Sequence, residues 1–302
     1  MASTRKVSFM SRGIKILADL YLPPSTKSYP DRKKSAVIVG HQGTGVKEQA
    51  SGLYAATLAA HGFVALTFDA AYQGESEGQP RGLEDPYQRV EDFKCAVTFL
   101  CNLEDGLVDP NRIGVVGICA SAGYGTCAAA TDPRIKAVAG ISPMCFGTLT
   151  RDGLRDSTGQ INPDHLEKLL DDAAKGRLEE AKGNPPVVHN IVDVFSDPKE
   201  DIKGYYTKWK HPRCTNEMVT RSAELLVTFD SFQYIEWISP RPVLMIAGRE
   251  AVTFQYSQPI IDRAKEPKEL VVLEGKGHVD LYQDVTETGP KLVSFMQKYL
   301  CT

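Results

Sequence analysis

The feature that most constrains the fold is a series of short, continuous apolar runs separated by helical stretches. The runs cover residues 36–39, 63–68, 113–119, 137–141, 243–247 and 270–273. Strands that are buried on both faces read as continuous apolar runs, and parallel strands need connections that are usually helical. The sequence therefore predicts an α/β fold with a mostly parallel central sheet.

Two segments depart from this rhythm. Residues 1–23 alternate apolar and polar side chains around a turn at residues 11–13, which predicts a β-hairpin. Residues 147–228 are rich in charge and lack buried runs, so we interpret them as an inserted helical lid. The remaining residues, 1–146 and 229–302, then form the core domain.

Composition and charge exclude several classes of protein. The 302 residues are 42% hydrophobic, which suits a sizeable core, and the formal charge of −3 gives no case for binding nucleic acid or a membrane surface. The 7 cysteines are scattered without paired spacing, so they indicate neither a disulfide framework nor a zinc site. We expect no metal and a reducing, cytoplasmic compartment. We expect no secretory leader, because residues 1–10 lack the apolar stretch that such leaders carry. The sequence leaves the oligomeric state open, with a homodimer as one option.

The most informative motif is RIGVVGICASAGYG, residues 112–125. A buried run leads directly into small residues and then a helical stretch, as in a nucleophile elbow of consensus G-x-S-x-G. Residues 117–121 fit this consensus with Cys119 in the nucleophile position. A helix N-terminus and a nearby imidazole both favour a thiolate. We predict Cys119 as the nucleophile and the Ala120 N–H as one oxyanion-hole donor.

Two other interpretations of this motif compete with that one. A shifted register makes Ser121 the nucleophile, but places it inside the helix rather than at the end of the strand. Alternatively, Cys119 is a small buried residue without chemistry, as free cysteines often are. The context of strand, turn and helix favours Cys119.

The loop GHQGTG, residues 40–45, follows the first buried run, where this kind of site places its second oxyanion donor. The donor is the N–H of Gln42 or of Gly43, and the sequence does not choose between them. The loop lacks the GxGxxG spacing of a dinucleotide site and the GK[ST] of a phosphate loop, so we expect no cofactor.

The predicted base is His278, in the glycine-rich loop EGKGHVD after the last buried run. A histidine here matches the chain order of nucleophile, acid and base. His41 is the next candidate, although its place in the loop of residues 40–45 fits the oxyanion hole better.

The acid departs from expectation, because the loop after residues 243–247 holds no aspartate. Glu250 is available there. Asp230 is the other candidate, since it begins a short helix predicted at 231–238 that returns from the lid on the active face. Asp230 also fits a capping box with Gln233. We favour Asp230 and keep Glu250 as the alternative acid. The acid could be dispensable, because a cysteine of lowered pKa depends less on it than a serine does.

Taken together, the motifs VVGICASAGYG, FDAAYQGESEG, FDSF, SPRPVLMIAG followed by AVT, and GHVDLYQ resemble the fungal polyketide transferases and thiohydrolases. These are dienelactone-hydrolase-like, stand-alone thioesterase-like proteins of secondary metabolism. The resemblance covers the whole chain and implies an α/β-hydrolase fold. It implies that an acyl chain passes from the carrier domain of a polyketide synthase, or from a small thioester or ester, onto Cys119. Water, an alcohol or an internal hydroxyl that closes a macrolactone then releases it.

Two alternatives remain beside this reading. One is an ester or lactone hydrolase of the dienelactone type. The other is a catalytically idle hydrolase-fold protein that acts by binding. In the leading reading the lid forms the acyl pocket, with Ile191, Val192, Phe195, Tyr205 and Tyr206 as its candidate apolar face.

Overall fold

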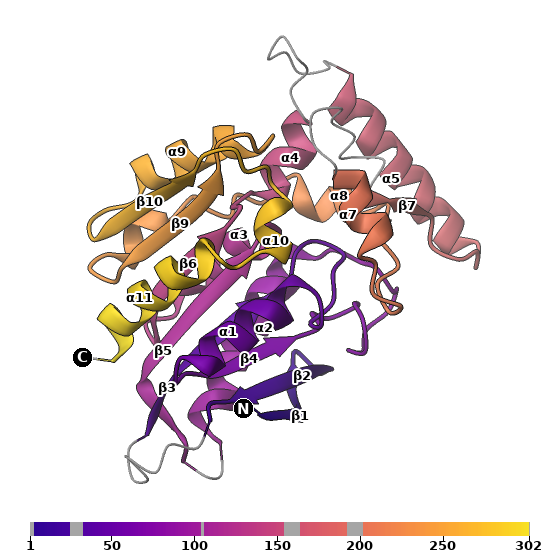
Figure 1. The fold of residues 1–302 in the computed structure, drawn as a ribbon. Helices are drawn as coiled ribbons and strands as arrows, with labels where there is room; N and C mark the ends of the chain where they lie inside the picture. The colour runs from indigo at the N-terminus through magenta and orange to yellow at the C-terminus, as the bar shows by residue number, and fades with distance from the viewer. Residues whose placement is uncertain (1–2, 25–32, 104–105, 154–163, 192–201, 302) are drawn as a thin grey trace.

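The computed structural model describes residues 3–24, 33–103, 106–153, 164–191 and 202–301 (Figure 1). The strands of the main sheet are β1 (Ser3–Ser11), β2 (Ile14–Leu22), β3 (Lys34–Gly40), β4 (Val64–Phe68), β5 (Val108–Ile118), β6 (Ile135–Ile141), β9 (Val243–Gly248) and β10 (Lys268–Leu273). They form an 8-stranded sheet of order β1-β2-β4-β3-β5-β6-β9-β10. β1 and β2 pair antiparallel, as do β2 and β4, and all other pairs are parallel.

The helices that cover this sheet are α1 (Ala50–Ala60), α2 (Pro86–Cys101), α3 (Ala120–Thr131), the 3₁₀ helix η1 (Ile235–Ile238), α9 (Phe254–Arg263), α10 (Asp280–Gln283) and α11 (Thr288–Leu300). Right-handed crossovers put α1 on one face, because its connection runs toward the β1 edge of the sheet. The connections through α2, α3 and α9 run the other way and lie on the opposite face. α11 packs beside α1, and η1 packs against α3 and α9.

A large insertion separates β6 from β9. Its elements are α4 (Phe146–Asp152), α5 (His165–Ala181), β7 (Val188–Asn190), α7 (Ile202–Lys208), β8 (Glu217–Val219) and α8 (Ser222–Leu226). β7 and β8 pair antiparallel in a small second sheet. Figure 1 shows α5, β7, α7 and α8 gathered at the upper right of the molecule, away from β9 and β10. The predicted lid, residues 147–228, lies within this insertion.

The predictions about the sheet are confirmed, since each apolar run coincides with a strand, β3, β4, β5, β6, β9 or β10. The N-terminal hairpin is confirmed as well, and Arg12 and Gly13 both have positive φ, as a two-residue turn of type I′ requires. The helix predicted at 231–238 is reduced to the 3₁₀ turn η1. Within the described residues, no helix has both the length and the apolarity to cross a membrane.

Candidate active site

The carboxyl ends of the parallel strands meet at one edge of the sheet, and the candidate residues lie in the loops that follow them. Gly43 follows β3, Cys119 follows β5, Met144 follows β6, Thr253 follows β9 and His278 follows β10. Residues far apart in the sequence are therefore neighbours at this edge, where open α/β sheets carry their sites.

Cys119 occupies the turn between β5 and α3 with φ 57° and ψ −120°, a left-handed conformation that is strained for a residue with a side chain. The turn is tight enough that a Cβ added at Gly117 would lie 2.1 Å from the Ser121 carbonyl oxygen. The sulfur of Cys119 lies 3.1 Å from the Met144 sulfur, and the cysteine is only 2% exposed. The cysteine therefore stands at a nucleophile elbow, in a sealed environment.

Two backbone donors point at the Cys119 sulfur. The N–H groups of Ala120 and Gly43 both hydrogen-bond it. Of the two donors left open by the sequence, the structure brings Gly43 to the sulfur. The Gln42 side chain instead donates to the Tyr205 hydroxyl at 3.2 Å. If the sulfur attacked a carbonyl carbon, the same two N–H groups would be placed to donate hydrogen bonds to the carbonyl oxygen.

His278 is buried, with both ring nitrogens engaged. Nδ1 lies 2.5 Å from the Thr253 hydroxyl, and Nε2 lies 2.7 Å from the Tyr282 hydroxyl. The Tyr282 hydroxyl also hydrogen-bonds the Cys119 sulfur. The backbone of His278 is held too, because the Ser142 hydroxyl donates to its carbonyl at 2.8 Å. Cys119, Tyr282, His278 and Thr253 thus form a continuous chain of contacts.

Burial sets the electrostatics of this group. It raises the pKa of the Cys119 thiol, an effect that hydrogen bonds from Tyr282, Ala120 and Gly43 partly offset. It lowers the pKa of His278 to about 4. Both groups are therefore neutral near pH 7 in this closed structure. The sequence predicted a thiolate favoured by the helix N-terminus, but burial is the largest influence on Cys119 and raises the pKa of its thiol instead.

The two rival candidates in this region have other partners. His41 is fully buried, its Nδ1 faces the Gln42 carbonyl at 2.7 Å, and its Nε2 accepts from the Ala70 N–H at 3.1 Å. Burial and the neighbouring Arg89 hold the pKa of His41 well below its ordinary value. The Ser121 hydroxyl donates to the His41 carbonyl at 2.5 Å. Both residues therefore hold the loop of residues 40–45 rather than the reacting atoms.

The structure does not bring either predicted acid to the imidazole. One Asp230 oxygen accepts from the Phe232 N–H at 2.9 Å, and the other lies 3.3 Å from the Arg263 guanidinium. Asp230 thus stabilises the turn before η1, close to the capping role considered from the sequence. Glu250 is exposed, and its backbone N–H donates to the Lys276 carbonyl. We correct the expectation accordingly: the group at Nδ1 is the Thr253 hydroxyl, because Thr253 ends the loop that usually carries the acid.

The sequence analysis missed Thr253 and Tyr282, although signals for both were present. Thr253 lies in the AVT segment, within the loop where an acid was sought, and a hydroxyl can also partner Nδ1–H. Tyr282 lies four residues after His278, in the short helix α10 that follows the histidine loop. Within the described residues, no group of His, Cys, Asp and Glu side chains could hold a metal ion.

The insertion contributes side chains that cover the cysteine. Tyr205 and Tyr206, on α7, are both buried and lie close enough for charge on Cys119 to affect them. The Tyr205 ring packs edge-on against Tyr282, with centroids 5.1 Å apart. Val192 and Phe195, also predicted to face the substrate, lie outside the described residues.

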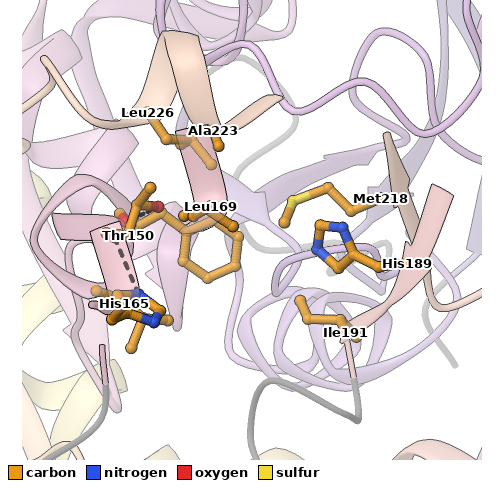
Figure 2. A pocket seen from close by; sticks show the side chains of 10 residues that line it. Thr150, His165, Leu169, His189, Ile191, Met218, Ala223 and Leu226 are labelled. Carbon is orange, nitrogen blue, oxygen red and sulfur yellow. Dashed lines mark hydrogen bonds between the residues drawn. The ribbon is translucent and has the colours of Figure 1, made fainter. Parts of the chain in front are cut away.

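A small apolar cavity of about 80 Å³ lies within the insertion. It is lined by Phe146, Leu149, Thr150, His165, Leu169, His189, Ile191, Met218, Ala223 and Leu226. Figure 2 shows His165 and His189 on opposite sides of it, with His165 hydrogen-bonded to Thr150. Phe146 separates the cavity from the oxyanion loop, since its ring carbon is 2.2 Å from the place a Cβ at Gly43 would occupy. Ile191, which was predicted to belong to the apolar face of the lid, lines this cavity.

This combination of fold and site is that of an α/β-hydrolase with a cysteine at the elbow. A family model described as "Alpha/beta hydrolase family" matches residues 36–288, and the chain belongs to this family. The uncharacterized protein PA2218 of Pseudomonas aeruginosa is 37% identical over 92% of this chain and 76% of its own. Its crystal structure superposes with a TM-score of 0.90 over 99% of this chain and 94% of that one. The uncharacterized protein YcjY of Escherichia coli is 33% identical over 98% of this chain and 99% of its own.

Fungal relatives are more distant. Polyketide transferase claH of Penicillium crustosum is 28% identical over 73% of each chain. The resemblance to fungal polyketide transferases that the motifs indicated is therefore present as a distant sequence similarity. The bacterial relatives named above are more similar in sequence.

The buried imidazole predicts a pH-dependent stability. The pKa of His278 is about 4 when folded and 6.5 ordinarily, so the unfolded chain binds more protons between these values. The contribution is fully present above pH 6.5 and is lost as the pH falls toward 4, by roughly 3 kcal/mol in total from this residue. We expect His278→Gln to have a smaller slope of unfolding free energy against pH in this window, with the part due to buried His41 retained. Urea titrations of both proteins measure it.

The control is His61→Gln, because His61 is exposed on the surface. This variant should keep the wild-type pH dependence. Equal slopes for wild type and His278→Gln would show that the imidazole is not desolvated.

Proposed function

We propose that this protein is a cysteine-dependent acyl hydrolase or acyltransferase that acts on a polyketide-like acyl thioester. The observation that carries the proposal is the arrangement at the Cys119 sulfur, where two backbone N–H donors and a histidine-linked hydroxyl converge at an elbow of positive φ. The name of the distant fungal relative, a polyketide transferase, supports the substrate class. The carrier domain of a polyketide synthase, or a small thioester, would deliver the acyl group.

The chemistry follows from the residues. The Cys119 proton leaves toward His278 as the sulfur attacks the acyl carbonyl carbon, and the N–H groups of Ala120 and Gly43 stabilise the oxyanion. The carbon–sulfur bond to the carrier breaks, and the leaving thiolate takes the proton back. Water or an alcohol then attacks the acyl-cysteine. Exchange of one thioester for another is nearly thermoneutral, so a cysteine suits a thioester donor better than an ester donor.

The cavity in the insertion provides space for the acyl chain. Because Phe146 contacts both the oxyanion loop and the cavity, a chain attached to Cys119 would run past Phe146 to reach it. Its lining is mainly apolar, which suits an alkyl or polyene segment. The insertion therefore acts as the lid of the acyl site in this proposal.

The nucleophile is tested with a matched pair of variants. Cys119→Ala should abolish turnover of an acyl thioester, since no other residue at the elbow carries a free nucleophile. Ser121→Ala should still form an acyl adduct on Cys119, because the Ser121 hydroxyl is bonded to the His41 carbonyl. Mass spectrometry of the peptide that contains residue 119 measures the adduct.

Turnover by Cys119→Ala, or loss only in Ser121→Ala, would contradict the assignment. Comparing an acyl thioester with a simple lactone on the wild-type enzyme separates the thioester reading from the dienelactone-type reading. An idle fold would form no adduct with either.

The third member of the site is tested with Thr253→Val and Asp230→Asn. Thr253→Val keeps the shape of the side chain but removes the partner of His278 Nδ1, a hydrogen bond worth about 1 kcal/mol, so the rate should fall about fivefold. Asp230→Asn should keep the wild-type rate, because Asp230 contacts Arg263 and the Phe232 N–H. Rates and melting temperatures of both variants are measured together. A reduced rate for Asp230→Asn together with a wild-type rate for Thr253→Val would instead assign the third position of the site to the Asp230 carboxylate.

The cavity is tested with Ala223→Leu, which places an isobutyl group in a space of about 80 Å³. We expect the enzyme to lose its activity on long-chain thioesters while it keeps activity on an acetyl thioester, which serves as the internal control. Rates across a chain-length series measure the effect. An unchanged chain-length profile would remove the cavity from the substrate site.

A further inference from the structure

The Tyr282 hydroxyl stands between the two residues that exchange a proton in the proposed reaction. It lies 2.7 Å from Nε2 of His278, and it hydrogen-bonds the sulfur of Cys119. The tyrosine is 1% exposed, and its ring packs against His278 and Tyr205 with centroid distances of 5.4 and 5.1 Å. The hydroxyl is therefore fixed in place by contacts on its ring.

We propose that Tyr282 is a catalytic residue that relays the proton between Cys119 and His278. This inference rests on the proposed acyl-transfer function and adds a step to it. In the resting state the thiol S–H faces the Met144 sulfur at 3.1 Å, and the tyrosine O–H donates to Nε2. The relay begins when the S–H turns to donate to the tyrosine oxygen. After the transfer, the tyrosine O–H donates to the thiolate, and Nε2–H donates to the tyrosine oxygen.

The protons balance in this relay. The S–H bond breaks as an O–H bond forms on Tyr282, and the original tyrosine O–H bond breaks as an N–H bond forms on His278. Tyrosine ends neutral, as it began, and the charge appears as a thiolate and an imidazolium. The Nδ1–H of the imidazolium donates to the Thr253 hydroxyl, which is 2.5 Å away.

The rest of the cycle uses the same path in reverse. The thiolate forms its bond to the acyl carbon, and the carrier sulfur leaves with the proton that Nε2 returns through Tyr282. In deacylation, the attacking water or alcohol gives its proton to Nε2 by the same route, and the Cys119 sulfur receives it as the acyl bond breaks.

The electrostatic setting supports a concerted relay. Burial raises the pKa of Tyr282 well above its ordinary value, so a free tyrosinate is strongly disfavoured. Burial also raises the pKa of Cys119 and lowers that of His278, so a stable ion pair does not form before substrate arrives. The two proton shifts are therefore coupled to each other and to the attack on the carbonyl.

The test compares Tyr282→Phe with Tyr54→Phe. Both changes remove one buried hydroxyl and keep the ring, but the Tyr54 hydroxyl bonds Leu281 and Thr288, away from the sulfur. The probe is the S-acetyl thioester of N-acetylcysteamine, and mass spectrometry follows acetylation of Cys119. We expect Tyr282→Phe to acetylate about 100-fold more slowly, the range of a positioned acid–base group, while Tyr54→Phe keeps the wild-type rate.

Two readouts separate a relay from a structural role. Acetylation rates in mixtures of H₂O and D₂O should curve with deuterium content in the wild type, because two protons move, and should be linear in Tyr282→Phe. Alkylation of Cys119 by iodoacetamide, which needs the thiolate but no acyl group, should slow in Tyr282→Phe as well. Melting temperatures check that both variants are folded.

The outcomes are distinct. Acetylation of Tyr282→Phe within about threefold of wild type, well short of the range of a positioned acid–base group, overturns the relay and leaves Cys119 as nucleophile. An equally curved solvent plot in the variant also overturns it. A wild-type protein that forms no adduct on Cys119 overturns the proposed function, and the relay with it.

Discussion

The site depends on one tight turn, where β5 ends and α3 begins. Cys119 adopts a positive φ that costs of order 1–3 kcal/mol for a residue with a side chain. The turn is held by the bond from the Cys119 N–H to the Ile141 carbonyl and by that from the Ala122 N–H to the Cys119 carbonyl. Because Gly117 has no Cβ, the helix can approach the strand closely. The same turn aims the sulfur, exposes the Ala120 N–H and directs Ser121 to the oxyanion loop.

Burial also determines the protonation of Cys119 and His278. Ionisation of a buried thiol or a buried imidazole is unfavourable, so the pKa of Cys119 is raised and that of His278 is lowered. The site therefore differs from one that rests as a thiolate–imidazolium pair. In the proposed reaction, donors are already in place for the charges that form: backbone N–H groups for the oxyanion and hydroxyls for the sulfur and the ring. Such preorganised dipoles stabilise charge most effectively where water is excluded.

The sequence was a good guide where backbone patterns carry the information. Continuous apolar runs identified the parallel strands, and the glycine turn pointed to Cys119 as the residue at the elbow. The histidine loop likewise identified His278, which the structure brings to the same site. The partner of Nδ1 was not predictable in this way, because an expected carboxylate is replaced by the Thr253 hydroxyl. Asp230 was a candidate because it is a charged residue predicted near the active face, yet in the structure its side chain pairs with Arg263. Side-chain partners across loops depend on packing that periodicity does not encode.

A buried charge pair connects the oxyanion loop to the insertion. The Arg89 guanidinium lies 3.2 Å from the His41 carbonyl and 3.2 Å from the Ser121 hydroxyl, and it pairs with Glu84 at 3.3 Å. The Glu84 backbone N–H donates to the Ser222 hydroxyl at the start of α8.

The next residue of α8, Ala223, lines the apolar cavity of the insertion. Removing one partner of a buried pair typically costs about 3–5 kcal/mol, so Arg89 and Glu84 stabilise each other in this position. A shift of α8 that widens the cavity would pull on Glu84, hence on Arg89 and on the loop that carries the Gly43 N–H. The cavity in the insertion and the loop of residues 40–45 are therefore physically connected through Ser222, Glu84 and Arg89.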